Sequence, residues 1–126
     1  MRPYNLLIWI QATYTLLTAL WPLIDIETFM AVTGPKTDVW LVKTVGALLI
    51  PVALCLYAHL RDNNVRLSAL VLGMGVALAF ICIDLFYALN DIILNIYLLD
   101  ALVELIFVIS WIAVAIRLRS GGAHVQ

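Results

Sequence analysis

Four apolar stretches, each as long as a membrane-spanning helix, run through almost the whole of this chain. A hydrocarbon core of about 30 Å needs roughly 20 apolar residues in helical conformation. Hydrophobic residues make up 65% of the 126 residues and charged residues only 12%, a composition that a soluble domain does not need. We therefore expect an all-α integral membrane protein, a single four-helix transmembrane domain over 1–126. Its predicted spans are about 5–24, 39–59, 67–89 and 97–118.

The four stretches favour helices over the strands of a membrane barrel. They are too long for barrel strands, and they lack the strict alternation of apolar and polar residues that such strands show. Because the connections are short, the four helices are predicted to form an antiparallel bundle. The first stretch follows Arg2 closely, but no small-x-small cleavage site comes after it. We expect it to be retained as the first span rather than removed as a signal peptide.

The positive charges predict an orientation in the membrane. All five arginines fall on one side of the predicted spans, whereas Lys36 and Lys43 fall near the other side. Cytoplasmic loops are enriched in Lys and Arg, so both termini are predicted to be cytoplasmic, in a membrane of the bacterial inner type. The opposite side holds seven of the eight carboxylates: Asp25, Glu27, Asp38, Asp84, Asp91, Asp100 and Glu104.

Ionisable groups from three helices are predicted to share one depth. Counted at about 1.5 Å per helical residue from the arginine side, Lys43, Asp84 and Asp100 all lie at roughly 25 to 27 Å. Glu104 lies one turn deeper, inside the hydrocarbon region, on the same helix face as Asp100. A single lysine cannot neutralise three acids. At least one carboxyl is therefore expected to be protonated or bound to a cation at neutral pH.

Further polar residues on the same side are expected to complete a pocket. Tyr87 and Asp91 follow Asp84 at three and seven residues, and Tyr97 precedes Asp100 by three. Lipid offers these groups no partner, so they are expected to converge inward. The predicted ligand-binding pocket faces outward. The predicted floor consists of Lys43, Asp84, Asp100 and Glu104. The predicted rim consists of Asp25, Tyr87, Asp91 and Tyr97.

The leading hypothesis for this pocket is that it binds or moves a small cationic or amphiphilic ligand, or protons. Ionisable residues inside a membrane point to function by default. The competing interpretation is a salt bridge from Lys43 to Asp84 or Asp100 that only fixes helix packing. An intramembrane lipid isomerase with Asp100 and Glu104 as a catalytic acid/base pair is a third hypothesis, which leaves enzymatic activity open.

A second class of function is that of a non-catalytic accessory or assembly subunit in a larger membrane complex. Ala69, Gly73 and Ala77 repeat at every fourth residue, a pattern that allows close helix contact. That contact is expected either inside the bundle or with another subunit, including a second copy of the chain. Beyond the lipid bilayer, such a complex is the only macromolecular partner predicted, because a net charge of −1 gives no basis for nucleic-acid binding.

No cofactor and no metal site are expected. The carboxylates lack an accompanying histidine, since His59 falls on the arginine side and His124 in a tail expected to be frayed. Cys55 and Cys82 fall inside predicted spans and are expected to be buried small hydrophobes rather than redox thiols. The longest connection, 25–38, is expected to form a lid on the membrane surface.

Three short segments in the first half of the chain carry a family resemblance. A Leu-Trp-Pro sequence at 20–22 closes the first predicted helix, and Thr33 and Gly34 lie in the connection after it. Residues 43–49, Lys-Thr-Val-Gly-Ala-Leu-Leu, open the second helix. A basic residue followed by such a Gly-Ala-Leu-Leu run resembles the small four-helix DoxX-like membrane proteins. The resemblance covers the first two predicted helices and implies a four-helix membrane fold.

Overall fold

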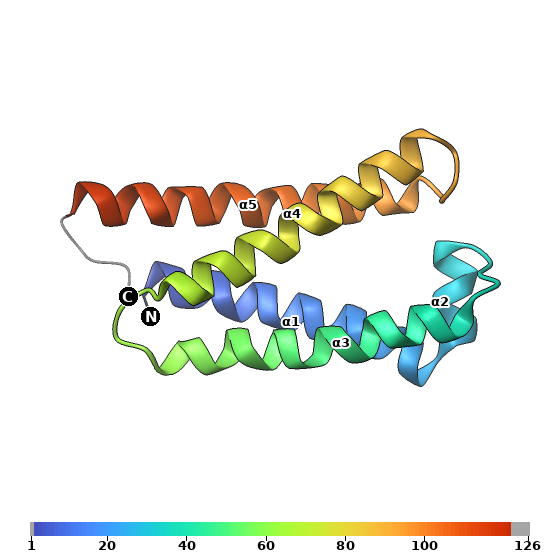
Figure 1. The fold of residues 1–126 in the computed structure, drawn as a ribbon, viewed down its shortest axis with the longest axis horizontal. Helices are drawn as coiled ribbons and strands as arrows, with labels where there is room; N and C mark the ends of the chain where they lie inside the picture. Colours follow the sequence, from blue (N-terminus) through green and yellow to red (C-terminus); the bar gives the residue numbers. More distant parts are fainter. Residues whose placement is uncertain (1, 122–126) are drawn as a thin grey trace.

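A computed structural model describes residues 2–121, which fold almost entirely into helices (Figure 1). Four of the helices in this part of the chain are long and apolar enough to cross a membrane. This confirms the prediction of a multi-pass, all-helical membrane protein, and the four helices begin and end within a few residues of the predicted spans. Residues 122–126, which include His124, lie outside the described residues. The elements are α1 (Pro3–Ile24), α2 (Ile26–Thr33), α3 (Val39–Ala58), the 3-10 turn η1 (His59–Arg61), α4 (Leu67–Leu89) and α5 (Ile96–Ser120).

The short helix α2 occupies the connection that was predicted only as a surface lid. The Asp25 carboxylate accepts a hydrogen bond from the backbone N–H of Thr28 at 3.1 Å and thereby caps the helix start. Phe29 and Met30 are partly buried, which gives the helix an inward face. The helix ends at Thr33 and is followed by Gly34, whose φ of 98° would be strained for a residue with a side chain. A capping acid, one apolar face and a closing glycine thus produce a helix of two turns.

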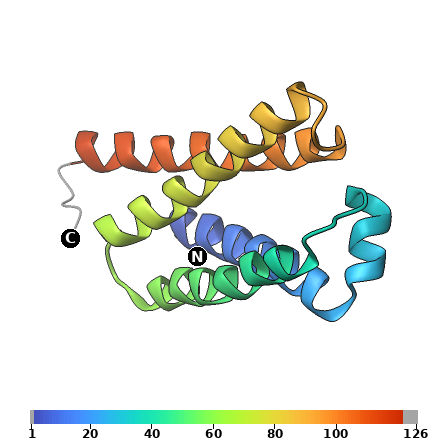
Figure 2. The same cartoon turned by 45° about the vertical axis from the view of Figure 1, so that its right-hand side comes forward.

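The four long helices pack as two pairs, α1 along α3 and α4 along α5, with far less contact between the pairs. Both views show the pairs close together near the chain's N-terminus and separating toward the end where α2 lies (Figures 1 and 2). We call the first the arginine end and the second the carboxylate end. The buried core lies toward the arginine end and includes Tyr4, Leu7, Ile8, Ala12, Leu56, Val65, Ala69, Ala77, Phe107, Val108 and Trp111.

A buried hydrogen-bonded chain joins three helices within this core. The Trp111 indole Nε1 on α5 donates to Gln11 Oε1 on α1 at 2.8 Å, and Gln11 Nε2 donates to the Gly73 carbonyl on α4 at 2.8 Å. A Cβ at Gly73 would lie 2.5 Å from the Trp111 ring, so the tryptophan needs the absence of a side chain there. The small-residue face of α4, including Ala69 and Ala77, is therefore a contact inside the chain.

The loop at the arginine end is fixed by its one acid. Asp62 Oδ2 accepts from His59 Nδ1 at 2.7 Å and from Arg66 Nε at 3.1 Å, while Tyr4 donates to the Asp62 backbone carbonyl at 2.8 Å. The hydrogen bond from His59, and then that from Arg66, hold the pKa of Asp62 below its ordinary value. These contacts tie the connection between the two pairs to the start of α1.

The structure corrects one expectation about the cysteines. Cys55 and Cys82 were expected to be buried, but both are exposed on the surface of the described chain. Their helix faces point away from the core, so in a membrane these thiols would face the apolar bilayer rather than the protein interior. Their position inside the spans was predicted, whereas the direction in which they point was not.

Candidate functional site

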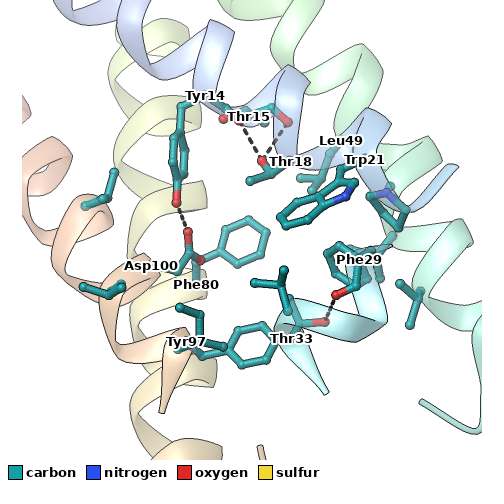
Figure 3. Close-up of a pocket in the computed structure, with 18 of the residues that line it drawn as sticks. Tyr14, Thr15, Thr18, Trp21, Phe29, Thr33, Leu49, Phe80, Tyr97 and Asp100 are labelled. Atoms are coloured by element: carbon teal, nitrogen blue, oxygen red, sulfur yellow. Dashed lines mark hydrogen bonds between the residues drawn. The ribbon is translucent and has the colours of Figure 1, made fainter. Parts of the chain in front are cut away.

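A cavity of about 430 Å³ lies between the two helix pairs toward the carboxylate end. This volume is within the range of about 300 to 1,000 Å³ that small-molecule sites occupy. Aromatic and aliphatic side chains form most of its wall, as Figure 3 shows for Trp21, Phe29 and Phe80. Every α-helix contributes to it. The polar lining residues are Tyr14, Thr15, Thr18, Thr33, Lys36, Tyr97, Asp100 and Glu104.

The cavity exists because α3 stays close to α1 while α4 leans away (Figure 2). At Gly46 on α3, a Cβ would lie 2.7 Å from the Ala19 carbonyl on α1, so glycine permits a very close helix contact. From α4, by contrast, only Phe80 reaches the cavity among the described residues. The space between the pairs is therefore left unfilled at this level.

Tyr14 and Asp100 meet on the cavity wall and join the two pairs. The Tyr14 hydroxyl on α1 donates a hydrogen bond to Asp100 Oδ1 on α5 (Figure 3). Asp84 lies on α4 near Asp100 and is only 3% exposed, and its Oδ2 atom is buried with no hydrogen-bond partner in residues 2–121. Two carboxyl groups, one from α4 and one from α5, are thus close together beside the cavity.

Glu104 lies one turn of α5 beyond Asp100 and also lines the cavity. Its side chain is 3% exposed, and its Oε2 atom is buried with no hydrogen-bond partner in residues 2–121. A buried acceptor left without a partner costs about 1 to 3 kcal/mol, and more if it is charged. The carboxyl thus has an unused hydrogen-bonding position beside a cavity, which a proton or a ligand donor would fill.

The lysine at this cavity is Lys36, not Lys43. Lys36 Nζ donates to the carbonyls of Thr33 at 3.0 Å and Gly34 at 3.3 Å, and it lies 5.2 Å from the centroid of the Tyr97 ring. This contact joins the end of α2 to the start of α5. Lys43 is exposed on α3, does not line the cavity, and takes part in neither of the ion pairs in the described structure.

The predicted pocket residues are therefore divided. Asp100, Glu104 and Tyr97 line the cavity, and Asp84 lies against Asp100. Asp25 instead caps α2, and Tyr87 packs against Phe86 with ring centroids 5.1 Å apart. Asp91 is exposed in the connection from α4 to α5, where its φ is 57°. These three lie near the same end of the chain but outside the cavity lining.

Several lining residues were absent from the predicted set, and some had a signal in the sequence. Tyr14, Thr15 and Thr18 are polar residues within one apolar span, separated from one another by one to four positions. Polar side chains that recur on one side of a span are expected to face the protein interior. Lys36 follows Gly34 and Pro35, and the chain turn at these residues brings it back toward α5.

The described residues contain no group of three His, Cys, Asp or Glu side chains placed to hold a metal ion. No protein-family model, curated protein or solved structure matches the chain. The resemblance of the first two helices to DoxX-like proteins stays a prediction. The cavity and its side chains are therefore the basis for an assignment of function.

Proposed function

We propose that the cavity binds a small amphiphile that has an apolar body and a protonated amine. The observation that carries this proposal is the buried, unpartnered Glu104 Oε2 on the wall of a largely apolar cavity. An ammonium group beside Glu104 and Asp100 would supply both hydrogen-bond donors and a compensating charge. The apolar body would lie against side chains such as Phe29 and Phe80.

Binding of such a cation is proposed to displace a proton. The site contains two neighbouring carboxyls, Asp84 and Asp100, and a third, Glu104, one helix turn beyond Asp100. Three ionised acids in this setting would repel one another strongly, and the nearest lysine, Lys36, is turned toward backbone carbonyls. The empty cluster would therefore be protonated in part. A bound ammonium would take the place of that proton, so affinity would rise with pH.

We also propose that the four spans form an antiparallel bundle in a membrane of the bacterial inner type, with both termini in the cytoplasm. The five arginines at one end support this orientation, because cytoplasmic segments are enriched in Lys and Arg. The carboxylate end, with α2 beside it, would then be on the outer side. In this arrangement the amphiphile would reach the cavity from the outer half of the membrane.

The test is retention of radiolabelled dodecylamine by the protein in phosphatidylcholine nanodiscs, with empty nanodiscs subtracted. We expect saturable binding, weakened about tenfold or more in Glu104→Gln, since a hydrogen bond to a charged group contributes about 1.5 to 3 kcal/mol. Glu27→Gln is the matched control. Glu27 is an exposed acid of α2 that does not line the cavity, so its variant is expected to bind as the wild type does.

Dodecanol has the same chain length but no charge, and it separates recognition of the amine from simple partition into apolar space. Equal retention of dodecanol and dodecylamine, or an equal loss of binding in both variants, would contradict the proposal. A pH indicator in weak buffer gives the proton readout. Release of protons on dodecylamine binding would support the displacement of a proton. Binding without proton release would support the amine site and contradict the displacement.

The alternative function, an accessory subunit, is favoured by a different face of α4. Gly75 is exposed, a Cβ built there would meet no described atom within 4 Å, and Ala79 next to it on this face is also exposed. Such a small-residue strip permits close approach of another helix. If Gly75→Leu released a co-purifying partner protein without a change in dodecylamine binding, the subunit function would gain support.

A further inference from the structure

A second hollow, of about 310 Å³, runs along the outer surface between α1 and α5 and shares no residue with the carboxylate-end cavity. We call it the α1–α5 groove. Leu7 and Phe107 form its buried floor, while Leu6, Ile10 and Ile106 are more than half exposed along its sides. The groove is therefore an apolar channel that is open to the surroundings of the helices.

Small residues on α5 leave this groove unfilled. Ser110 and Ala113 face it, where longer side chains would close the gap to α1. The Ser110 hydroxyl donates to the Ile106 carbonyl at 2.8 Å, so its hydrogen is already used within the helix. The only strong hydrogen-bond donor among the described lining residues is thus the guanidinium of Arg117.

Arg117 lies at one end of the groove, in the last turn of α5. It is eleven residues beyond Ile106, which corresponds to about 16 Å along the helix. Its side chain is exposed and belongs to neither of the described ion pairs. All five arginines lie at or beside the helix ends that meet here, and Asp62 is the only acid among the described residues of this end, so the local field favours an anion.

The shape of the groove selects a single chain over a second helix. Helices that associate in membranes approach through small residues on both sides, whereas Leu6, Ile10 and Ile106 are bulky and project beside the hollow. A flexible acyl chain can lie in a narrow channel between such side chains. The combination of a chain-sized apolar channel with a cation at its membrane-surface end matches one class of molecule, an anionic phospholipid.

We propose that the α1–α5 groove binds one anionic phospholipid, with an acyl chain along Leu7 and Phe107 and its phosphate at Arg117. The guanidinium can form two parallel hydrogen bonds to phosphate oxygens, and the surrounding positive charge adds a preference for a headgroup of net negative charge. This site is independent of the amine site, because the two cavities lie toward opposite ends of the helices.

The experiment is native mass spectrometry of the protein released from micelles that contain equal amounts of phosphatidylglycerol and phosphatidylcholine with identical acyl chains. We expect the wild type to retain one phosphatidylglycerol molecule in preference to phosphatidylcholine, and Arg117→Gln to bind it about fivefold more weakly. Arg119→Gln is the matched control. It removes the same charge from the same helix turn, but at a residue outside the groove.

A groove-filling variant tests the path of the acyl chain separately. Ala113→Phe is expected to remove retention of both lipids, whereas Ala47→Phe, at an exposed position of α3, is expected to leave retention unchanged. Equal retention of the two lipids by the wild type would overturn the proposal. So would equal losses in the two arginine variants, which would indicate attraction to the whole arginine end rather than a site, or retention that Ala113→Phe does not reduce.

Discussion

At the arginine end, the Trp111 ring fills the space beside Gly73 and each polar group of the Gln11 side chain has a partner. At the carboxylate end, the same helices leave a cavity and the Glu104 carboxyl has an unused acceptor. The core around Gln11 and Trp111 has the packing of a stable protein interior, although Asn5 Oδ1 near the start of α1 is also buried without a partner in residues 2–121. The carboxylate end retains polar groups that its own packing does not satisfy, as is common at sites that bind a ligand.

Removal of Trp111 tests this difference with the largest expected effect. Trp111→Ala is expected to lower the free energy of unfolding by about 3 to 5 kcal/mol, because it empties a fully buried site and removes the hydrogen bond to Gln11. Chemical unfolding in detergent micelles, followed by circular dichroism, measures the loss. Trp40→Ala, at an exposed tryptophan of α3, is the control and is expected to change stability by less than about 0.5 kcal/mol. Similar losses in both variants would show that the arginine end is not the more tightly packed one.

Variants of the two lysines test which of them affects binding at the carboxylate end. Lys36→Met is expected to strengthen dodecylamine binding about threefold, because it removes a like charge from the cavity lining. Lys43→Met removes the same charge from an exposed site outside the lining and is expected to leave binding unchanged. The radioligand assay in nanodiscs measures both. An effect of Lys43 alone would instead favour the pocket predicted from the sequence.

The smallest expected effect concerns Asp62 at the arginine end. Its folded-state pKa is below the ordinary value of 3.8, first because of the hydrogen bond from His59. A carboxyl with a depressed pKa contributes stability above its unfolded-state pKa and loses that contribution as the pH falls through its folded-state pKa. Asp62→Asn is therefore expected to lower Tm slightly at neutral pH, with a difference from wild type that shrinks below about pH 3.8. The exposed Asp91→Asn serves as the control, and a Tm difference for Asp62→Asn that persisted at low pH would contradict this explanation.

The sequence was sufficient to predict the four spans, because their length and apolar composition are set by the bilayer rather than by tertiary contacts. It was also sufficient to bring Asp84 and Asp100 to one level, with Glu104 one turn deeper, since the helical rise converts residue number into depth. The helix α2 was not predicted. Its two turns are too short for a clear pattern, although Asp25 at its start and Gly34 at its end are ordinary helix-boundary residues.

The assignment of Lys43 to the pocket shows what a depth estimated from residue number cannot predict. Each residue turns the side chain by about 100° around the helix, so Lys43 points elsewhere than its neighbour Val42, which lines the cavity. Depth alone contains no information about this direction. The pairing of Tyr14 with Asp100 could not be predicted for the same reason, because it depends on how α1 and α5 are rotated relative to each other.

The hydrogen bond from Tyr14 to Asp100 has a mechanical consequence. It connects the two helix pairs at the level where they otherwise diverge, and its acceptor is a carboxyl that lines the cavity. Any cation that binds Asp100 competes with the Tyr14 hydroxyl for this carboxyl. Binding of a cation in the cavity would therefore change the spacing of the helix pairs. A distance measured between spectroscopic labels on α1 and α5 would detect that change.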